Sequence, residues 1–272
     1  MVRSLWTAAT GMNAQQTNVD TIANNLANVN STGYKAQVAQ FKSLLYQNLQ
    51  TVTTTANGDP KPTTAQVGLG VRNSSINSIF TQGSLLDSQS DTAFAIQGDA
   101  FFAVRGEDGQ TYYTRNGDFI WAIGANGGMT LTDSDGLPVL DSRGRAIALN
   151  RNYIASKITI SADGEVCYPD ASNNPQPIGI TIGLFQFSNP GGLERVGDTR
   201  WAETEASGRA INEATNANVK KSSVIQGYLE GSNVSVADEM VNLIVAQRAY
   251  EVNSKAITTS DSMMDTANNL KR

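Results

Sequence analysis

Apolar residues recur every seven positions at both ends of the chain, and this pattern limits the possible folds more than any other feature. In the segment from Arg3 to about Asn28, the rows are Leu5, Met12, Val19 and Leu26, and Ala8, Gln15, Ile22 and Val29. In the segment from about Val236 to Leu270, the rows are Leu243, Tyr250, Ile257 and Met264, and Ala249, Ala256, Met263 and Leu270. A seven-residue repeat is typical of helices that pack along their length. The sequence therefore predicts two long terminal helices, which most simply pair with each other.

Both predicted helices end at residues that are suited to capping. The first helix should stop near Asn30, with Gly33 as a left-handed cap, because glycine adopts positive φ without a steric penalty. The second should begin at about Val236, where the side chain of Ser235 or Asp238 can accept hydrogen bonds from the first free backbone N–H groups. The two helices thus have defined ends in the sequence.

The chain between the helices has the pattern of strands and turns. Short aromatic and β-branched runs alternate with Gly-Asp and Asn-Gly turns about every ten residues. The predicted fold class is α+β: long N- and C-terminal helices pair as a coiled-coil domain and flank a mostly antiparallel β domain. We predict a coiled-coil domain over 1–35 and 232–272, an extended linker over 36–80, and a β domain with its return linker over 81–231.

The polar face of the first helix carries amides instead of charges. Asn24, Asn25 and Asn28 lie near its end, although asparagine is about 0.6 kcal/mol worse than alanine in a helix. Neutral amides can be buried if they are hydrogen-bonded, whereas unpaired buried charges cost several kcal/mol. Such a face suits a solvated helix rich in amides, a contact with other protein, or a narrow polar lumen. Apolar rows on two sides of the second helix favour self-assembly.

The predicted assembly interface combines apolar heptad positions with these amides. It consists of Leu5, Met12, Val19, Ile22, Asn24, Asn25, Leu26, Asn28, Met240, Leu243, Gln247, Tyr250, Ile257 and Met264. An aspartate at Leu243 should therefore prevent assembly, because it places an unpaired charge in an apolar contact. An aspartate at Thr132, in a predicted exposed turn, should have little effect.

The composition argues against an enzyme. The 272 residues include no histidine, which removes the commonest general base and metal ligand. The single cysteine, Cys167, has no partner for a disulfide or a CxxC pair, and we expect it to be a buried or half-buried strand residue. The net charge of −5 gives no basic surface for nucleic acid. We predict no catalytic residue, no metal, no cofactor and no small-molecule substrate.

Two short clusters leave a different class of function open, that of a protein that hydrolyses or binds cell-wall glycans. Hydrolysis would need two carboxylates at a cleft, and the candidates are Glu203 and Glu205, which follow Trp201. A simpler interpretation is a pair of carboxylates at a strand edge beside a packing tryptophan. The candidate sugar-binding aromatic residues, which are also suited to a core, are Tyr112, Tyr113 and Trp121.

Several segments resemble bacterial flagellar axial proteins, the family of rod, hook and hook-associated subunits. "NNLANVNSTGYK" near the N-terminus and "VAQRAYEVNSKAI" near the C-terminus are similar to the paired signatures of this family. "AIQGDAFFAV" and "YYTRNGDF" resemble a β segment that rod and hook subunits share. The resemblance covers nearly the whole chain and is closest to the subunits of the distal rod.

The resemblance implies a structural subunit of the flagellar distal rod that self-assembles helically into a hollow drive shaft and transmits torque from rotor to hook. The terminal helices would form the inner tube and the β domain the outer layer. Residues 47–66 correspond in position to a segment that rod subunits have and hook subunits lack or vary. A hook subunit and a proximal rod subunit are the alternatives within the family.

The resemblance also implies partners and a location. The partners would be further copies of the chain, proximal rod proteins, hook protein and the flagellar export apparatus, with ring proteins around the rod as a further candidate. The location would be the basal body outside the cytoplasmic membrane, in the periplasm or cell wall. The sequence start lacks an apolar run long enough for a signal peptide, so we expect export without a cleaved signal.

Overall fold

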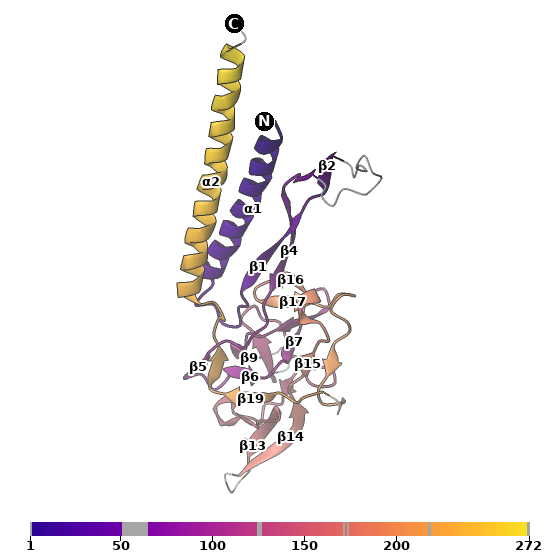
Figure 1. Ribbon diagram of the computed structural model, residues 1–272. Helices are drawn as coiled ribbons and strands as arrows, with labels where there is room; N and C mark the ends of the chain where they lie inside the picture. Colours follow the sequence, from indigo (N-terminus) through magenta and orange to yellow (C-terminus); the bar gives the residue numbers. More distant parts are fainter. Residues whose placement is uncertain are drawn as a thin grey trace. The chain divides into compact units, whose positions relative to one another are not determined.

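Two long helices occupy the ends of the chain, as predicted. In the computed structural model, which describes residues 2–50, 65–123, 127–170, 172, 174–216 and 219–270, they are α1 (Val2–Ala27) and α2 (Val236–Asn269) (Figure 1). Ser235 caps α2, with its hydroxyl accepting a hydrogen bond from Asp238 N at 3.5 Å. Gly33 has a φ of +67°, which confirms the predicted left-handed residue. A β-carbon there would lie 2.4 Å from Asn116 N, so only glycine fits.

The chain divides into two compact units. We call the first the helical unit; it consists of Met1–Ala27, Gln37–Asn77 and Ser235–Arg272. We call the second the β unit; it consists of Asn28–Ala36 and Ser78–Val234. Among the described residues, neither unit contains a helix that combines the length and apolarity needed to cross a membrane.

Four strands belong to the helical unit, and we call them the arm. They are β1 (Gln37–Ser43), which pairs with β4 (Val71–Ser78), and β2 (Tyr46–Gln50), which pairs with β3 (Ala65–Gly68) in antiparallel fashion. The arm is bonded to α1, because Thr17 Oγ1 accepts from Asn73 Nδ2 at 2.7 Å and Thr10 Oγ1 accepts from Val71 N at 3.3 Å. Most of the predicted rod-specific segment, residues 51–64, lies outside the described residues.

The β unit is built from short strands in several sheets. One six-stranded sheet has the order β16 (Glu194–Gly197), β17 (Arg200–Ala202), β8 (Thr111–Thr114), β7 (Phe101–Arg105), β15 (Leu184–Gln186), β18 (Ile211–Asn212). Two three-stranded sheets have the orders β11 (Ala148–Leu149), β10 (Met129–Asp133), β9 (Phe119–Ile123) and β12 (Thr159–Ile160), β13 (Glu165–Pro169), β14 (Pro175–Thr181). Two pairs complete the unit: β19 (Ser223–Gln226) with β6 (Phe94–Gln97), and β20 (Tyr228–Glu230) with β5 (Leu85–Asp87). Short 3₁₀ turns lie at Ala155–Lys157 and Pro190–Gly192.

The pairing confirms the predicted α+β class. The strand pairs of the β unit are antiparallel in register, for example Phe102 opposite Thr114 and Leu131 opposite Trp121. Cys167 is buried in β13, as expected for a cysteine that packs as a small apolar residue.

Aromatic side chains form two neighbouring parts of the β-unit core. In the first, Phe102 packs edge-on against Phe119 with ring centroids 5.2 Å apart. In the second, Trp201 contacts Phe101 with centroids 5.8 Å apart. Edge-to-face packing is one of the geometries that aromatic rings prefer. The β unit therefore has an apolar core of its own.

The expectation that Thr132 lies in an exposed turn is wrong. Thr132 lies in β10, where it is buried and its hydroxyl donates to Ile120 O at 3.1 Å. The turn begins one residue later, because Gly136 N bonds back to Asp133 O. An aspartate at Thr132 would therefore not be silent, since its carboxylate would be buried.

Candidate assembly interface

Helices α1 and α2 lie side by side and run antiparallel within the helical unit (Figure 1). The hydroxyl oxygens of Ser4 and Ser260 are 3.2 Å apart. Toward the other end, Asn25 Nδ2 donates to Glu239 Oε1 at 3.2 Å. Ser4 and Asn25 are 21 residues apart on α1, and their partners Ser260 and Glu239 are 21 residues apart on α2 in the opposite direction. This constant correspondence fixes the register of the two helices.

Small and polar residues form the closest contacts between the helices. Between the two ends just described, Gly11 faces Asn253, and a β-carbon on Gly11 would lie 3.0 Å from Asn253 Nδ2. On α2 the buried residues are Ala246 and Ser260, two heptads apart. Small residues allow helix axes to approach closely. On α1, the residues that contact α2 therefore form a row that lies one position before Leu5, Met12, Val19 and Leu26. The predicted apolar rows consequently flank the contact.

The predicted interface residues occupy different environments. The buried ones are Ile22 and Asn25. The half-buried ones are Leu5, Met12, Val19, Leu26, Asn28, Leu243, Ile257 and Met264. The exposed ones are Asn24, Met240, Gln247 and Tyr250. Asn28 belongs to the β unit and the others belong to the helical unit.

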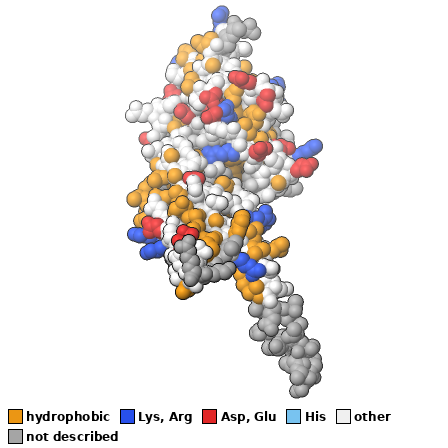
Figure 2. Space-filling view, turned by 90° about the horizontal axis from the view of Figure 1, so that it is seen from above, with side chains coloured by type: hydrophobic (Ala, Val, Ile, Leu, Met, Phe, Trp, Pro, Cys, Tyr) orange, Lys and Arg blue, Asp and Glu red, His pale blue; other side chains and the backbone are white. Residues whose placement is uncertain are grey.

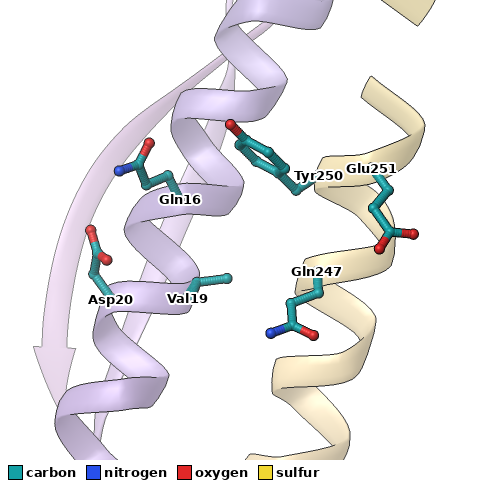
Figure 3. A pocket seen from close by; sticks show the side chains of 6 residues that line it. All are labelled: Gln16, Val19, Asp20, Gln247, Tyr250 and Glu251. Carbon is teal, nitrogen blue, oxygen red and sulfur yellow. The ribbon is translucent and has the colours of Figure 1, made fainter. Parts of the chain in front are cut away.

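A groove between the helices brings three of these residues together. Val19, Gln247 and Tyr250 line a volume of about 400 Å³ with Gln16, Asp20 and Glu251 (Figure 3). Val19 on α1 and Tyr250 on α2 point toward the facing helix (Figure 3). The groove is therefore apolar at its centre and polar along its rim.

Asn25 explains part of the unusual amide face of α1. Its side chain is 1% exposed, its Oδ1 accepts from Gln37 N at 2.9 Å, and its Nδ2 donates to Gln37 O at 2.8 Å. The adjacent Asn24 donates to Gln37 Oε1 at 3.2 Å. An amide can bond the N–H and C=O of one residue at once, which a charged side chain cannot do. Asn25 therefore fastens the first residue of the arm to α1 within its own chain.

Apolar side chains on α2 remain exposed after the helices have paired. Val241, Val245 and Val252 are 59%, 62% and 67% exposed, and Ile244 beside them is 56% exposed. Positions 241, 245 and 252 lie on one side of a helix, so these residues form a stripe, which we call the α2 stripe. Charged side chains are scattered among apolar and uncharged polar ones on the face shown in Figure 2. The run "MVNLIV" is the sequence signal for the stripe, since one packed row does not need consecutive apolar residues.

The candidate glycan sites have structural roles. Trp201 is buried in the core, and Glu203 Oε2 accepts a hydrogen bond from Ala210 N at 3.2 Å. Tyr113 is also buried, and burial, aided by the charge of Glu203, raises its pKa to about 12. Within the described residues, His, Cys, Asp and Glu side chains do not gather in groups of three that could hold a metal ion.

The other two aromatic candidates are half-buried. Tyr112 and Trp121 pack against the first part of the core. The Tyr112 hydroxyl donates to Asp108 Oδ2 at 2.7 Å, which lowers the pKa of that carboxyl and raises the pKa of Tyr112. These aromatic side chains are thus occupied by packing or by a local hydrogen bond.

Three family models match separate parts of the chain. Residues 5–35 match the family described as flagella basal body rod protein, and residues 225–270 match the C-terminal region of flagellar basal body rod FlgEFG proteins. Residues 95–168 match the D1 domain of the flagellar hook proteins FlgE/F/G. The matched parts contain both helices and much of the β unit.

Full-length relatives agree with these matches. The chain is 45% identical to the flagellar basal-body rod protein FlgG of Borreliella burgdorferi, over 100% of both chains. It is 40% identical to FlgG of Agrobacterium fabrum, over 96% of this chain and 97% of the relative. It is 35% identical to FlgG of Bacillus subtilis, over 100% of both chains. The chain belongs to the flagellar basal-body rod protein family.

Proposed function

We propose that the chain is the structural subunit of the flagellar distal rod, which assembles helically into a hollow drive shaft and transmits torque from rotor to hook. Its full-length similarity to proteins named FlgG favours this assignment over a hook or proximal rod subunit. The α2 stripe is the observation that carries self-assembly, because it stays exposed when α1 and α2 have paired.

In this proposal the helix pair is a coiled coil. The spacing of the contacts at Ser4, Gly11 and Asn25 supports it, because these positions differ by multiples of seven, the repeat of two helices that wind around each other. Burial of an exposed valine or isoleucine yields about 1.5–3 kcal/mol, so covering the α2 stripe would offset a substantial cost of association. A contact between two different surfaces of identical subunits continues into a helical filament when the rotation between copies does not close into a ring. The stripe of one copy therefore packs on a different face of the next copy.

The domains of the subunit take separate places in this shaft. The coiled-coil domain, 1–35 and 232–272, forms the inner tube, and the β domain, 81–231, forms the outer layer. Within the segment 36–80, residues 47–66 pack between neighbouring subunits and stiffen the shaft. The interface residues of α1 and α2 take part in these contacts, except Asn25 and Ile22, which are already buried within the chain.

The partners and the location follow from the same assignment. The shaft contacts proximal rod proteins at one end and hook protein at the other, with ring proteins around it. The subunit passes through the flagellar export apparatus without a cleaved signal peptide and assembles outside the cytoplasmic membrane. These proposals are supported by the family membership of the chain.

The subunit has no hydrolytic activity in this proposal. Trp201 is part of the core, and Glu203 holds the backbone of Ala210. A gel with embedded peptidoglycan should stay uncleared by the purified protein. Clearing that disappears in Glu203→Gln would support the glycan-hydrolysing alternative instead.

Electron microscopy of the purified protein at rising concentration tests the proposed function. Straight hollow rods are the expected result. Curved filaments would assign the chain to the hook, and a protein that stays monomeric at every concentration would contradict self-assembly.

A further inference from the structure

Three charged side chains lie in the interior of the β unit, apart from the proposed assembly surface. The side chains of Lys35 and Glu230 are 0% exposed and that of Arg115 is 1% exposed. Lys35 Nζ lies 2.6 Å from Glu230 Oε1, and Arg115 Nη1 lies 3.2 Å from Glu230 Oε2. Desolvation costs several kcal/mol for each buried ion, and replacing such groups with apolar residues is often neutral. Stability alone is therefore a weak explanation for this cluster.

Glu230 is the group that both cations share. Burial lowers the pKa of Lys35 and of Arg115, and the negative charge of Glu230 opposes this effect at both. Arg115 is further held by Gly98 O, which accepts from Nη2 at 2.7 Å, and by the ring of Phe101, whose centroid lies 5.0 Å from the guanidinium carbon. Loss of the carboxylate would leave both cations without the acidic side chain that they bond directly.

Bonds around Glu230 join three separate segments of the chain. Its Oε1 also accepts from Gly83 N at 3.0 Å, and its backbone carbonyl accepts from Gly33 N at 2.7 Å. Lys35 Nζ donates to Thr81 O at 2.8 Å as well as to Glu230. The segments 33–36, 79–83 and 230–233 thus meet at one carboxylate.

Asn233 connects the same three segments a second time. Its Oδ1 accepts from Ala36 N at 2.7 Å, and its Nδ2 donates to Ile79 O and to Thr81 Oγ1, each at 2.8 Å. These bonds are neutral and more exposed than the Glu230 cluster. The repeated connection indicates that the joining of these segments is a property of the fold and not of one side chain.

The three segments adjoin three of the four places where the chain enters or leaves the β unit. The chain passes between the units after residues 27, 36, 77 and 234. Segment 33–36 ends at one passage, segment 79–83 follows another, and segment 230–233 precedes the last. The covalent connections between the two units of the rod subunit lie at these passages.

We infer that Glu230 is a positioning residue for the rod subunit, which anchors three of the four chain passages to one another inside the β unit. A force on the helical unit then enters the β unit through one bonded anchor instead of through separate, mobile connections. The assignment of a load rests on the proposed function. The anchor itself is a property of the single chain and can be measured without assembly.

Hydrogen–deuterium exchange of the full-length, unassembled chain tests this inference in Glu230→Gln. Amides in segments 33–36, 79–83 and 230–233 should exchange faster by on the order of tenfold, because hydrogen bonds to a charged group are lost. Amides in β7 should keep their protection, since the aromatic core is untouched. Unchanged exchange in the three segments, or equal acceleration that includes β7, would overturn the inference.

A matched control and a second variant complete the test. Glu213 is a buried carboxylate in the same unit that binds Ser222 and Gln186, so Glu213→Gln should leave the three segments unchanged. If Glu230→Gln does not fold, the variant Lys35→Met provides the test, because it leaves Arg115 and Glu230 as an ion pair of balanced charge. Faster exchange in Lys35→Met that is confined to segments 33–36 and 79–83 supports the anchoring role, and any other pattern of exchange overturns it. A wild-type chain that never polymerises would refute the proposed rod function and leave these exchange results standing.

Discussion

Gly11 of α1 lies directly against the side chain of Asn253 of α2, so close that a methyl group at position 11 fits only if Asn253 moves. A β-carbon at position 11 would stand 3.0 Å from Asn253 Nδ2. Glycine in a helix interior costs about 0.5–1 kcal/mol relative to alanine, so its presence here needs a packing reason. The close approach of the two helices supplies that reason.

A larger side chain at Gly11 should separate the helices. Gly11→Leu forces Asn253 out of its place, and overpacking of this kind typically costs about 1–3 kcal/mol. Gly11→Ala should be nearly neutral, because the flexible Asn253 side chain can move by a few tenths of an ångström while the helix gains propensity. Thermal unfolding followed by circular dichroism at 222 nm measures both variants. A Gly11→Leu chain as stable as wild type would show that the helices do not pack closely at this point.

The sequence predicted both helices well because their local signals agree. Apolar periodicity, the cap at Ser235 and the glycine at position 33 all act within a few residues, and each of them is confirmed. The row of closest contact could not be predicted, because a heptad search follows large apolar residues. Here Ser4 and Gly11 of α1 make the contact by being small.

The buried charges and amides were also beyond the reach of sequence. Lys35 and Glu230 are separated by 195 positions, and nothing local indicates that one carboxylate is placed between two cations. The amide face of α1 was recognised as unusual, but the bonds of Asn25 to both backbone groups of Gln37 depend on how the chain returns after the helix. Long-range polar partners become visible only in the folded chain.

An aspartate at Thr132 should destabilise the β unit. The carboxylate would lie at a buried position of β10, where the Thr132 hydroxyl donates to Ile120 O, and a carboxylate cannot donate. The expected loss is several kcal/mol. Thr132→Val, which keeps the shape, should cost only about 1 kcal/mol for the lost hydrogen bond. Urea unfolding of the two variants measures this difference, and equal stability of Thr132→Asp and wild type would contradict the buried position.

Alkaline pH should weaken the β unit through Tyr113. Burial raises the pKa of its hydroxyl to about 12, whereas in the unfolded chain it ionises near its ordinary value of 10. Between these values the unfolded chain has released a proton that the folded chain retains. Stability therefore falls as pH rises from 10 to 12, by at most about 1.4 kcal/mol per pH unit from this group.

The variant Tyr113→Phe isolates this effect from other titrating groups. The difference in unfolding free energy between Tyr113→Phe and wild type should shift in favour of the variant across pH 10 to 12 and stay constant below pH 9. Urea unfolding at several pH values measures it. A difference that does not change with pH would place the Tyr113 hydroxyl in contact with water.

Polymerisation of Val245→Asp is the most direct test of the account. Val245 is 62% exposed on the α2 stripe, so an aspartate there should change the stability of the single subunit by no more than about 0.5 kcal/mol. In the filament the same carboxylate would be buried without a partner at every subunit, which costs several kcal/mol each time.

The control is Ile123→Asp, which introduces the same charge at an 80% exposed apolar position of the β unit. Wild type and Ile123→Asp should form rods that sediment at high speed and are visible by electron microscopy. Val245→Asp should stay in the supernatant as a folded monomer with an unchanged melting temperature. Rods of Val245→Asp that form at the wild-type critical concentration would contradict the claim that the α2 stripe drives assembly.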